Sequence, residues 1–505
     1  MIISPSFSLY SLVFLFEFNF DFEINQNQNN YANNFNHGNY QGAPADIFAL
    51  GVVLFSLLYG LFPFESSSAN SRKYQLIRNG SFNEYWTLLE NSAHIQINNN
   101  LRNLFQGMFE PNPAQRFTLA QILNHPWMQR LRRIRQLGMT NLVYPGAQHT
   151  RFSHALRAMH LMQMAIQTLQ SKGVDITGEE GIANMAAMLL HDIGHGPFSH
   201  VLESSIVEGV SHEEISFLLM KGMNEQLDGR LSPTLDVFSG KCKPFLHQLI
   251  SSQLDTDRMD YLNRDSFFTG VTEGSIANER IIKMLNIANG ELVVEAKGIY
   301  SVEKFLIARR LMYWQVYMHK TVVAAERMLI KILSRAKYLA MRGEDIFASP
   351  ALKFFLYNKI SASDFANEEP IRMFTLLDDN DIMTAIKVWM SSGDKVLSSL
   401  STAFINRKLF HIELSRQPFA PHRLQMVREA INKKMGIPMD EIEYYMLSGQ
   451  LSSKTYTVGN DRINIMFSPT YICDISEASD IFNIQALGNI DRRFYLCYPK
   501  EVDMD

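Results

Sequence analysis

The chain has 505 residues, a length at which about three domains are expected. Its 46% hydrophobic and 19% charged residues exclude a wholly disordered protein, and its net charge of −4 gives no reason to expect a protein held on nucleic acid by a basic surface. Three widely spaced cysteines, Cys242, Cys473 and Cys497, argue against a disulfide framework and a cysteine zinc site. We therefore expect a reducing, intracellular compartment.

The first 40 residues lack the features of a folded domain. Met1–Phe22 is apolar, but acidic residues interrupt it and no Lys or Arg occurs before Arg72, unlike a secretory signal. Residues 25–36 are mostly Asn and Gln, which offer too little apolar surface for a packed core. We expect residues 1–40 to be poorly ordered, or to be a faulty start of the gene model.

The apolar run Ile47–Phe64 is long enough to raise the question of a membrane span. It contains Gly51, Ser56 and Gly60, lacks flanking basic residues, and follows Asp46, which could cap a helix. The pattern favours a buried helix, and no membrane partner is expected.

Residues 41–128 carry two motifs of the protein-kinase C-lobe. Residues 42–60 resemble its central buried helix, and Pro111–Thr118 followed by His125–Trp127 resembles its end. The Gly-rich loop, the ATP-pairing Lys, the catalytic-loop Asp and the metal-binding Asp-Phe-Gly are absent from the sequence. We interpret residues 41–128 as a partial C-lobe without catalytic motifs, which excludes phosphoryl transfer by this part.

From Gln129 onward the pattern changes. Apolar helical periodicity continues to about Leu356, with Gly/His-rich interruptions at 145–154 and 191–200. Beyond about residue 400, strand-like alternation appears at Lys408–Leu414, Thr455–Val458, Ile463–Phe467 and Arg493–Tyr498. The expected fold is mainly α, with a helical core over 129–400 and a smaller C-terminal α+β region over 401–505.

Histidines are concentrated in one part of this core. Seven of the 14 lie between His149 and His212, which favours metal or phosphate chemistry over isolated core histidines. His191 and Asp192 end an apolar helical run, and two glycines and a proline break the helix just after them. An imidazole beside a carboxylate suits an open site for a divalent metal ion, namely Mn, Fe, Mg, Ni or Zn.

Two ligands are too few, and two other segments offer more. One contains His154, and the other is the acidic segment 252–265. If this segment is helical, Asp257, Tyr261 and Asp265 share one face at spacings of four residues. Its residues Asp260 and Arg264 form an i, i+4 pair on another face, which we interpret as structural. The alternative is that the whole segment is a solvated, salt-bridged helix.

Taken together, four segments resemble the HD-domain phosphohydrolases, and more closely their dGTPase-like branch, the deoxynucleoside triphosphate triphosphohydrolases. The segments are Gln129–Gly138, Tyr144–His154, Leu190–His200 and Asp257–Asp265, and the resemblance continues through Ala308–Lys320 to cover about 129–505. It implies an HD-domain helical core. It also implies metal-dependent hydrolysis of a dNTP, such as dGTP, to a deoxynucleoside and inorganic triphosphate.

The resemblance assigns roles to individual residues. The metal ligands would be His154, His191, Asp192 and Asp257. The catalytic residues around the scissile phosphate would be His195, His200, His212 and Glu203. The substrate-binding residues would be Gln136, Arg151, Tyr261, Asp265, Arg309, Tyr317 and Lys320. On one continuous helix, Arg309, Tyr313 and Tyr317 would share a face with Lys320 near it. The resemblance also allows a homo-oligomer through the HD region, and no specific nucleic acid partner is expected.

One feature departs from the family pattern, because the kinase-like His125–Trp127 runs straight into the Gln129 motif. The family normally has a longer opening segment there, so the join has the form of a gene fusion or a mispredicted gene model, which would leave the core without its first elements. Two alternatives therefore stay open. One is another HD-family nucleotidase or phosphodiesterase, and the other is a non-catalytic, kinase-derived interaction protein fused to a defective hydrolase.

The absent ATP-handling motifs generate a first prediction. Residues 1–128 are expected to transfer no phosphoryl group, because nothing in them can hold ATP and its metal ions or activate an acceptor hydroxyl. The measurement is incubation of this fragment with radiolabelled ATP and protein substrates. Transfer of label above the no-protein control would contradict the interpretation.

Overall fold

A computed structural model describes five long stretches of the chain, residues 71–93, 122–198, 209–453, 462–479 and 491–502. It also describes the shorter pieces 52, 55, 62–64, 95, 97, 102, 105–106, 109, 200–203, 205 and 456–457. Residues 1–40, most of the run Ile47–Phe64, and Pro111–Thr118 lie outside the described residues. Among the described helices, none is both long enough and apolar enough to cross a membrane.

The chain divides into two compact units between Ala120 and Gln121. In the first unit, Ser71 caps helix α4 (Arg72–Arg78), and helix α5 (Phe82–Ala93) follows. Helix α5 buries Tyr85 and Trp86 in an aromatic cluster with Phe55, Phe105 and Phe109. These residues form a hydrophobic core separate from that of the second unit.

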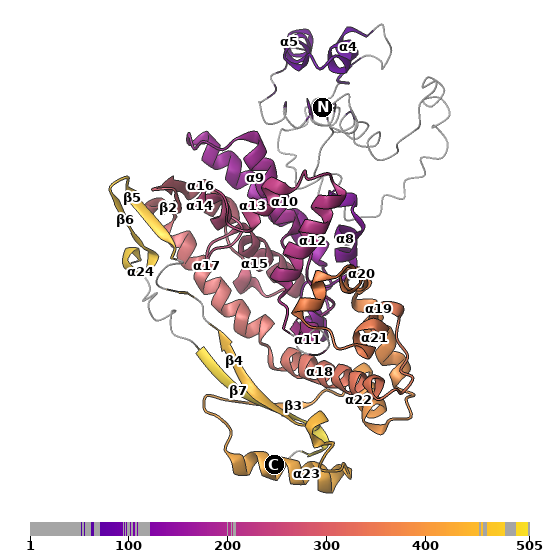
Figure 1. The fold of residues 1–505 in the computed structure, drawn as a ribbon. Coiled ribbons are helices and arrows are strands. Elements are labelled where there is room, and N and C mark those ends of the chain that lie inside the picture. Colours follow the sequence, from indigo (N-terminus) through magenta and orange to yellow (C-terminus); the bar gives the residue numbers. More distant parts are fainter. Residues whose placement is uncertain are drawn as a thin grey trace, which may run out of the picture. The chain divides into compact units, whose positions relative to one another are not determined.

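The second unit, Gln121–Asp505, is mainly helical, as expected from the sequence (Figure 1). Helices α9, α10, α13 and α15 pack together, and α18 contacts α19, α22 and β3. The α-helices among the described residues of this unit are α8 (Pro126–Arg130), α9 (Arg151–Ser171), α10 (Gly178–Leu190), α11 (His200–Glu203), α12 (His212–Gln226), α13 (Ser232–Phe238), α14 (Pro244–Gln248), α15 (Thr256–Thr269), α16 (Asn278–Met284), α17 (Ile299–Met312), α18 (Lys320–Met341), α19 (Pro350–Tyr357), α20 (Glu368–Leu376), α21 (Asp379–Trp389), α22 (Lys395–Ile405), α23 (Pro421–Met435) and α24 (Ile475–Ala478).

Two small sheets accompany these helices, of which the first is mixed and the second is antiparallel. The first has the order β1-β2-β5-β6 and contains β1 (Leu285–Ala288), β2 (Glu291–Glu295), β5 (Asn464–Ser468) and β6 (Tyr471–Asp474). The second has the order β3-β7-β4 and contains β3 (His411–Ser415), β4 (Leu447–Ser453) and β7 (Asp491–Tyr498).

The strand expectations were right in part. Strands β3, β5 and β7 lie close to three of the four expected segments, whereas Tyr456 and Thr457 are described and are not in a strand. The sequence pattern missed β1, β2, β4 and β6. Strand β2 pairs in parallel with β5, with Val293 opposite Asn464, so the C-terminal α+β region completes a sheet begun inside the helical core.

The His125–Trp127 motif, interpreted from the sequence as the end of a kinase lobe, lies in the second unit. His125 caps α8, and its Nε2 lies 2.9 Å from Oε1 of Gln226 on α12. The Trp127 ring lies against Gly222 so closely that a Cβ there would meet it at 3.1 Å. The segment just before the Gln129 motif is therefore packed on α12. The assignment of 41–128 to a kinase fragment stays a prediction.

A fully buried arginine joins three parts of this unit. Nη1 of Arg130 donates to the carbonyl oxygens of Phe374 and Leu377 at 3.3 and 3.0 Å. Its Nη2 donates to the carbonyls of Ile193 and His195 at 2.8 and 2.9 Å, and the guanidinium lies over the Phe374 ring. Arg130 thereby fixes the loop after His191-Asp192 against the end of α20.

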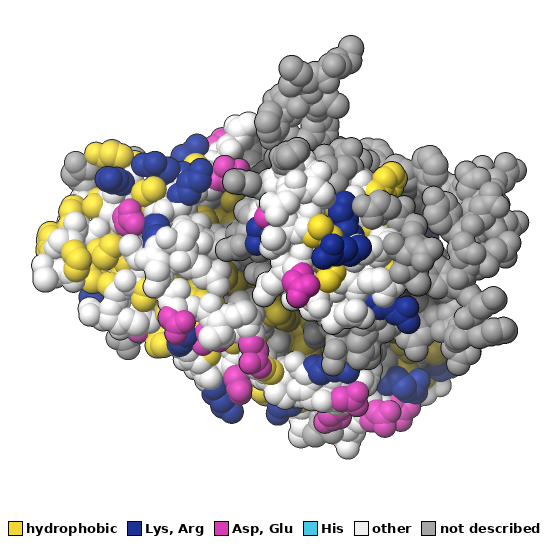
Figure 2. Space-filling view, turned by 90° about the horizontal axis from the view of Figure 1, so that it is seen from above, with side chains coloured by type: hydrophobic (Ala, Val, Ile, Leu, Met, Phe, Trp, Pro, Cys, Tyr) yellow, Lys and Arg dark blue, Asp and Glu magenta, His cyan; other side chains and the backbone are white. Residues whose placement is uncertain are grey.

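The surface carries both signs of charge. On the face shown in Figure 2, Lys, Arg, Asp and Glu side chains are interspersed with hydrophobic ones over the described residues. This mixture matches the nearly balanced totals of 47 basic and 51 acidic residues.

The contacts of Arg130 generate the second prediction. Arg130→Met should lower the free energy of unfolding of this unit by about 3 kcal/mol or more, because each buried carbonyl left without a donor costs about 1–3 kcal/mol. The measurement is calorimetric unfolding of the full chain. Arg132→Met is the matched control, because Arg132 is exposed and its contact with the Phe152 ring should be worth about 1 kcal/mol or less. Equal losses for the two variants would contradict the role of Arg130.

Candidate metal and phosphate site

Three helix ends bring the expected metal ligands together. Thr150 caps α9, which places His154 in the first turn of that helix. Helix α10 ends at Leu190, so that His191 and Asp192 follow at its C-terminal end. Asp255 caps α15 through the backbone N–H of Arg258, which places Asp257 in the first turn. The helix expected over 257–265 and the helix end expected before His191 are both present.

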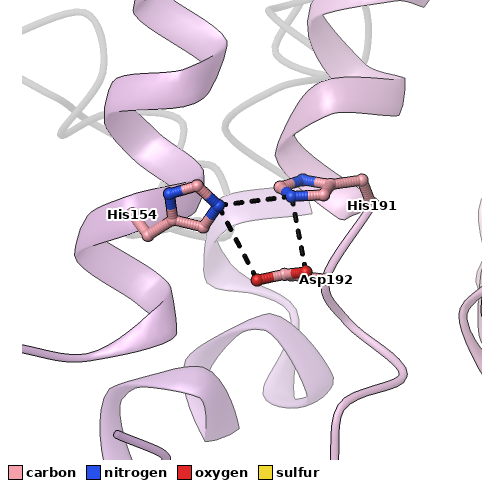
Figure 3. A group of neighbouring side chains, drawn as sticks. All are labelled: His154, His191 and Asp192. Atoms are coloured by element: carbon pink, nitrogen blue, oxygen red, sulfur yellow. Dashed lines mark hydrogen bonds and ion pairs between the residues drawn. The ribbon is translucent and has the colours of Figure 1, made fainter. Parts of the chain in front are cut away.

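The candidate ligand atoms of His154, His191 and Asp192 face one another (Figure 3). The Nε2 atoms of His154 and His191 are 3.3 Å apart, and Asp192 places Oδ2 3.8 Å from the first and Oδ1 3.4 Å from the second. Oδ1 of Asp257 lies 3.1 Å from Nε2 of His154 and 3.5 Å from Nε2 of His191. The ligand atoms of His154, His191 and Asp192 thus all lie within 4.8 Å of one another, and Asp257 contacts both histidines beside them.

The other ring nitrogen of each histidine is already engaged. Nδ1 of His154 lies 2.7 Å from Oδ2 of Asp260, and Nδ1 of His191 lies 2.6 Å from the carbonyl of Met188. When each Nδ1 carries the donated proton, both Nε2 atoms present lone pairs to the same point. Facing lone pairs beside two carboxylates require a positive charge between them, so this donor set fits a divalent cation.

The pKa values of these groups reflect the same need for positive charge. Burial lowers the pKa of His154, but its hydrogen bonds with Asp257 and Asp260 outweigh burial and raise the pKa to about 10. Burial raises the pKa of Asp257, but the hydrogen bonds with His154 and His191 outweigh it and hold the pKa below its usual value. Both shifts arise because positive charge on the histidines is stabilised by the carboxylates, and positive charge is also what a bound cation would supply.

Asp192 connects the metal ligands to the phosphate-side residues. Its Oδ2 accepts a hydrogen bond from Nη1 of Arg151 at 2.6 Å, and its Oδ1 lies 3.1 Å from Nε2 of His195. Burial and the Arg151 charge lower the pKa of His195 to about 3, so its imidazole is neutral at pH 7. Arg151 and His195 thus lie beside the ligand set, as the resemblance implies.

His195 and His212 are stacked, with ring centroids 3.9 Å apart and planes at 18°. Gly194 makes this possible, because a Cβ there would lie 2.2 Å from the carbonyl of His212, which begins α12. Two of the expected catalytic residues are therefore adjacent. The other two, His200 and Glu203, lie on α11, and their side chains are outside the described residues.

The residues expected to contact the sugar form a second cluster farther along α15. Asp265 is almost fully buried; its Oδ2 accepts from the Tyr317 hydroxyl at 2.7 Å, and its Oδ1 lies 2.8 Å from Nε2 of His149. The Tyr261 ring lies between this cluster and Asp257 along the helix and packs edge-on against Tyr317, with centroids 6.0 Å apart. Burial and the Asp265 charge raise the pKa of Tyr317, which keeps its hydroxyl protonated.

The expectation of one continuous helix from Arg309 to Lys320 was wrong. Helix α17 ends at Met312, a π-helical turn covers Tyr313–Tyr317, and α18 begins at Lys320. The turn is closed by a 2.7 Å hydrogen bond from the N–H of Met318 to the carbonyl of Tyr313. Because a π-helical turn is wound more widely than an α-helix, Tyr313 and Tyr317 do not keep the α-helical register expected from their four-residue spacing. Such turns often occur at functional sites.

Two polar groups among the expected substrate contacts have unused bonding capacity. Arg309 is buried beside Tyr313, and its Nε and Nη1 have no hydrogen-bond partner among the described residues. Oε1 of Gln136 is likewise buried without a partner in the described part of the chain, while its backbone N–H donates to the carbonyl of His149. Buried donors and acceptors of this kind are normally satisfied, so both are candidates for ligand contacts. Lys320 is exposed at the start of α18.

Two contacts of the site were not predicted from the sequence, that of Asp260 with His154 and that of His149 with Asp265. Asp260 was interpreted as structural, yet besides its pair with Arg264 it contacts the ligand His154. His149 was one of the clustered histidines but received no role, and it contacts Asp265. The three-residue spacing from Asp257 to Asp260, which places both carboxylates on neighbouring positions of one helix, is the signal that could have indicated the first contact.

Comparison with known families and proteins agrees with this geometry. The HD domain family matches residues 151–263, the HD associated region matches 276–346, and the protein kinase domain family matches 30–128. A solved phosphohydrolase from Bacteroides thetaiotaomicron is 53% identical, with a TM-score of 0.74 over 76% of this chain and 96% of that one.

Curated relatives point to the same family. The uncharacterized protein YwfO of Bacillus subtilis is 32% identical over 75% of this chain and 87% of its own length. The deoxynucleoside triphosphate triphosphohydrolase SAMHD1 of Gallus gallus is 25% identical over 66% of this chain and 57% of its own length. These matches show that the chain belongs to the HD-domain phosphohydrolases, the family that contains the deoxynucleoside triphosphate triphosphohydrolases.

Proposed function

We propose that this chain hydrolyses a dNTP to a deoxynucleoside and inorganic triphosphate. The observation that carries the proposal is that α15 presents Asp257 to the metal cluster and, two turns later, Asp265 to Tyr317, with Tyr261 between them. One helix thereby supports a metal centre next to a buried, aromatic-lined carboxylate. The name of the SAMHD1 relative supports the same substrate class.

His154, His191, Asp192 and Asp257 would hold the cation, which supplies positive charge at the α-phosphate and lowers the pKa of a nearby water. Arg309, with two buried N–H groups lacking partners among the described residues, would bind phosphate oxygens, and so would Arg151 and Lys320. Gln136, whose buried Oε1 also lacks a partner there, would contact the nucleoside.

In the reaction, the oxygen of a water molecule bonds to the α-phosphorus and the bond to the 5′-oxygen breaks. The departing 5′-oxygen takes up a proton, and the triphosphate leaves with the attacking oxygen. The proton would come from the histidine group His195, His200 and His212, with Glu203 orienting one of them. Because the pKa of His195 is lowered, His200 and His212 are the better candidates. The stacking of His195 on His212 supports a shared position beside the phosphate.

Asp265 would bind the sugar of the substrate and thereby select for it. A carboxylate has about four acceptor positions, and the bonds with His149 and Tyr317 use two of them, which leaves capacity for a 3′-hydroxyl. The Tyr261 and Tyr317 rings would pack against the sugar edge and leave little space for a 2′-hydroxyl.

The metal-ligand assignment gives the third prediction. His191→Ala and Asp192→Ala should abolish both metal retention and dNTP hydrolysis, because each removes a ligand atom. The measurements are the metal content of the purified full chain by elemental analysis and the release of triphosphate. His160→Ala, farther along α9, should keep both, as a matched histidine control. Normal turnover by metal-free Asp192→Ala would defeat the assignment.

The sugar-reading assignment gives the fourth prediction. A buried acceptor that loses its partner costs about 1–3 kcal/mol, or roughly 5- to 150-fold. A 3′-deoxy analogue should therefore be hydrolysed 5- to 150-fold less efficiently than the dNTP, and NTPs should also be poorer substrates. Asp265→Asn should reduce kcat/KM for dNTPs and leave the metal content unchanged.

Steady-state turnover of dNTP, NTP and 3′-deoxy substrates by the full chain separates the alternatives. Equal turnover of the three would favour another HD-family nucleotidase. Bound metal without hydrolysis of any nucleotide would favour the non-catalytic alternative.

A further inference from the structure

We propose that Asp260 is a positioning residue of the metal centre, which acts by holding His154 in the orientation and tautomer that a cation requires. The proposal rests on the metal site of the proposed function and is independent of the nucleotide that the enzyme hydrolyses.

Asp260 contacts His154 on the side of the imidazole opposite to Asp257. His154 is fully buried between α9 and α15, and its two ring nitrogens contact two different carboxylates of the same helix. Nε2 lies 3.1 Å from Oδ1 of Asp257, and Nδ1 lies 2.7 Å from Oδ2 of Asp260, one turn farther along α15. The imidazole is therefore held from both sides, and Asp260 is on the side opposite to the ligand cluster.

The contact with Asp260 determines which ring nitrogen of His154 carries the proton. With Asp260 as an acceptor, the stable arrangement keeps a proton on Nδ1, which leaves the Nε2 lone pair directed at His191, Asp192 and Asp257. The alternative tautomer, with the proton on Nε2 alone, would set a bare Nδ1 against Asp260 and leave Nε2 no lone pair for a cation beside Asp257. A carboxylate partner also makes the opposite nitrogen a stronger donor to a cation.

Asp260 keeps its negative charge in a buried position because two arginines contact it. Its Oδ2 accepts a second hydrogen bond from Nε of Arg264 at 2.9 Å, and its Oδ1 lies 3.2 Å from Nε of Arg157 on α9. Two guanidinium groups therefore support the ionised carboxylate and hold it in place. A buried charge without such partners would be strongly unfavourable.

His191 provides an internal comparison. Its Nδ1 is held by the carbonyl of Met188 at 2.6 Å, within its own helix end. Each metal-binding histidine therefore has an orienting acceptor, but only that of His154 is a side chain that can be replaced. The competing explanation is that Asp260 merely neutralises Arg264. That explanation does not account for the short contact with Nδ1 of a residue whose other nitrogen faces the ligand cluster.

The experiment is titration of the metal-free full chain with Mn²⁺, with the free ion measured by electron paramagnetic resonance. Asp260→Ala should raise the Kd for Mn²⁺ toward 100-fold, because replacement of such orienting partners costs about 10- to 100-fold in metal affinity. Asp260→Asn has nearly the same shape and should raise the Kd by about 10-fold, because its amide lacks the charge. Thermal unfolding in the presence of a chelator reports folding of each variant independently of the metal.

Arg264→Gln is the matched control, because it breaks the i, i+4 pair while Arg157 still pairs with Asp260 and the Asp260–His154 contact stays in place. Its Kd for Mn²⁺ should stay close to that of the unmodified protein while its unfolding temperature falls. An unchanged Kd in folded Asp260→Asn, or an equal rise in Kd for Arg264→Gln and Asp260→Asn, would overturn the proposal. Neither outcome depends on dNTP turnover, so it would leave the substrate assignment to be judged by its own test.

Discussion

Burial of the His154 imidazole between α9, α10 and α15 is the constraint on which the site depends. Around it, the carboxylates Asp192, Asp257 and Asp260 are removed from most of the solvent, and such burial is costly unless each charge has partners. Arg151 and Arg264 supply some of the compensation. The remaining negative charge lies where the two Nε2 atoms meet. A cation at that point therefore neutralises the core as well as serving the chemistry.

The rest of the unit maintains this geometry from a distance. Arg130 ties the carbonyls of Ile193 and His195 to the end of α20, which fixes the loop that carries the phosphate-side histidine. Gly194 lets the same loop approach the start of α12. The candidate metal ligands come from helix ends, but their relative positions depend on contacts made by residues outside the candidate site.

The sequence predicted the parts of this arrangement that have local signals. The helix end at His191-Asp192 and the face shared by Asp257 and Asp265 follow from breakers and periodicity, and the motif resemblance joined them. The Asp260–Arg264 pair was expected, but the contact of Asp260 with His154 was not, because the two residues lie on different helices about a hundred residues apart. Strand β2 was missed although Asn289-Gly290, with φ of 53° and 80°, forms the tight turn that joins it to its antiparallel neighbour β1. Its other neighbour, β5, lies far along the chain, so that pairing has no local signal.

The parallel pairing of β2 with β5 also determines when this enzyme can finish folding. On the ribosome, the metal-binding helices and β2 emerge well before Asn464–Ser468 is made. Until then, the edge of β2 that will pair with β5 lacks its partner. Closing so long a loop costs entropy before the pairing returns any energy. The sheet β1-β2-β5-β6 can therefore form completely only after its C-terminal strands are made, and a nascent chain stalled before residue 464 would expose a strand edge open to misassociation.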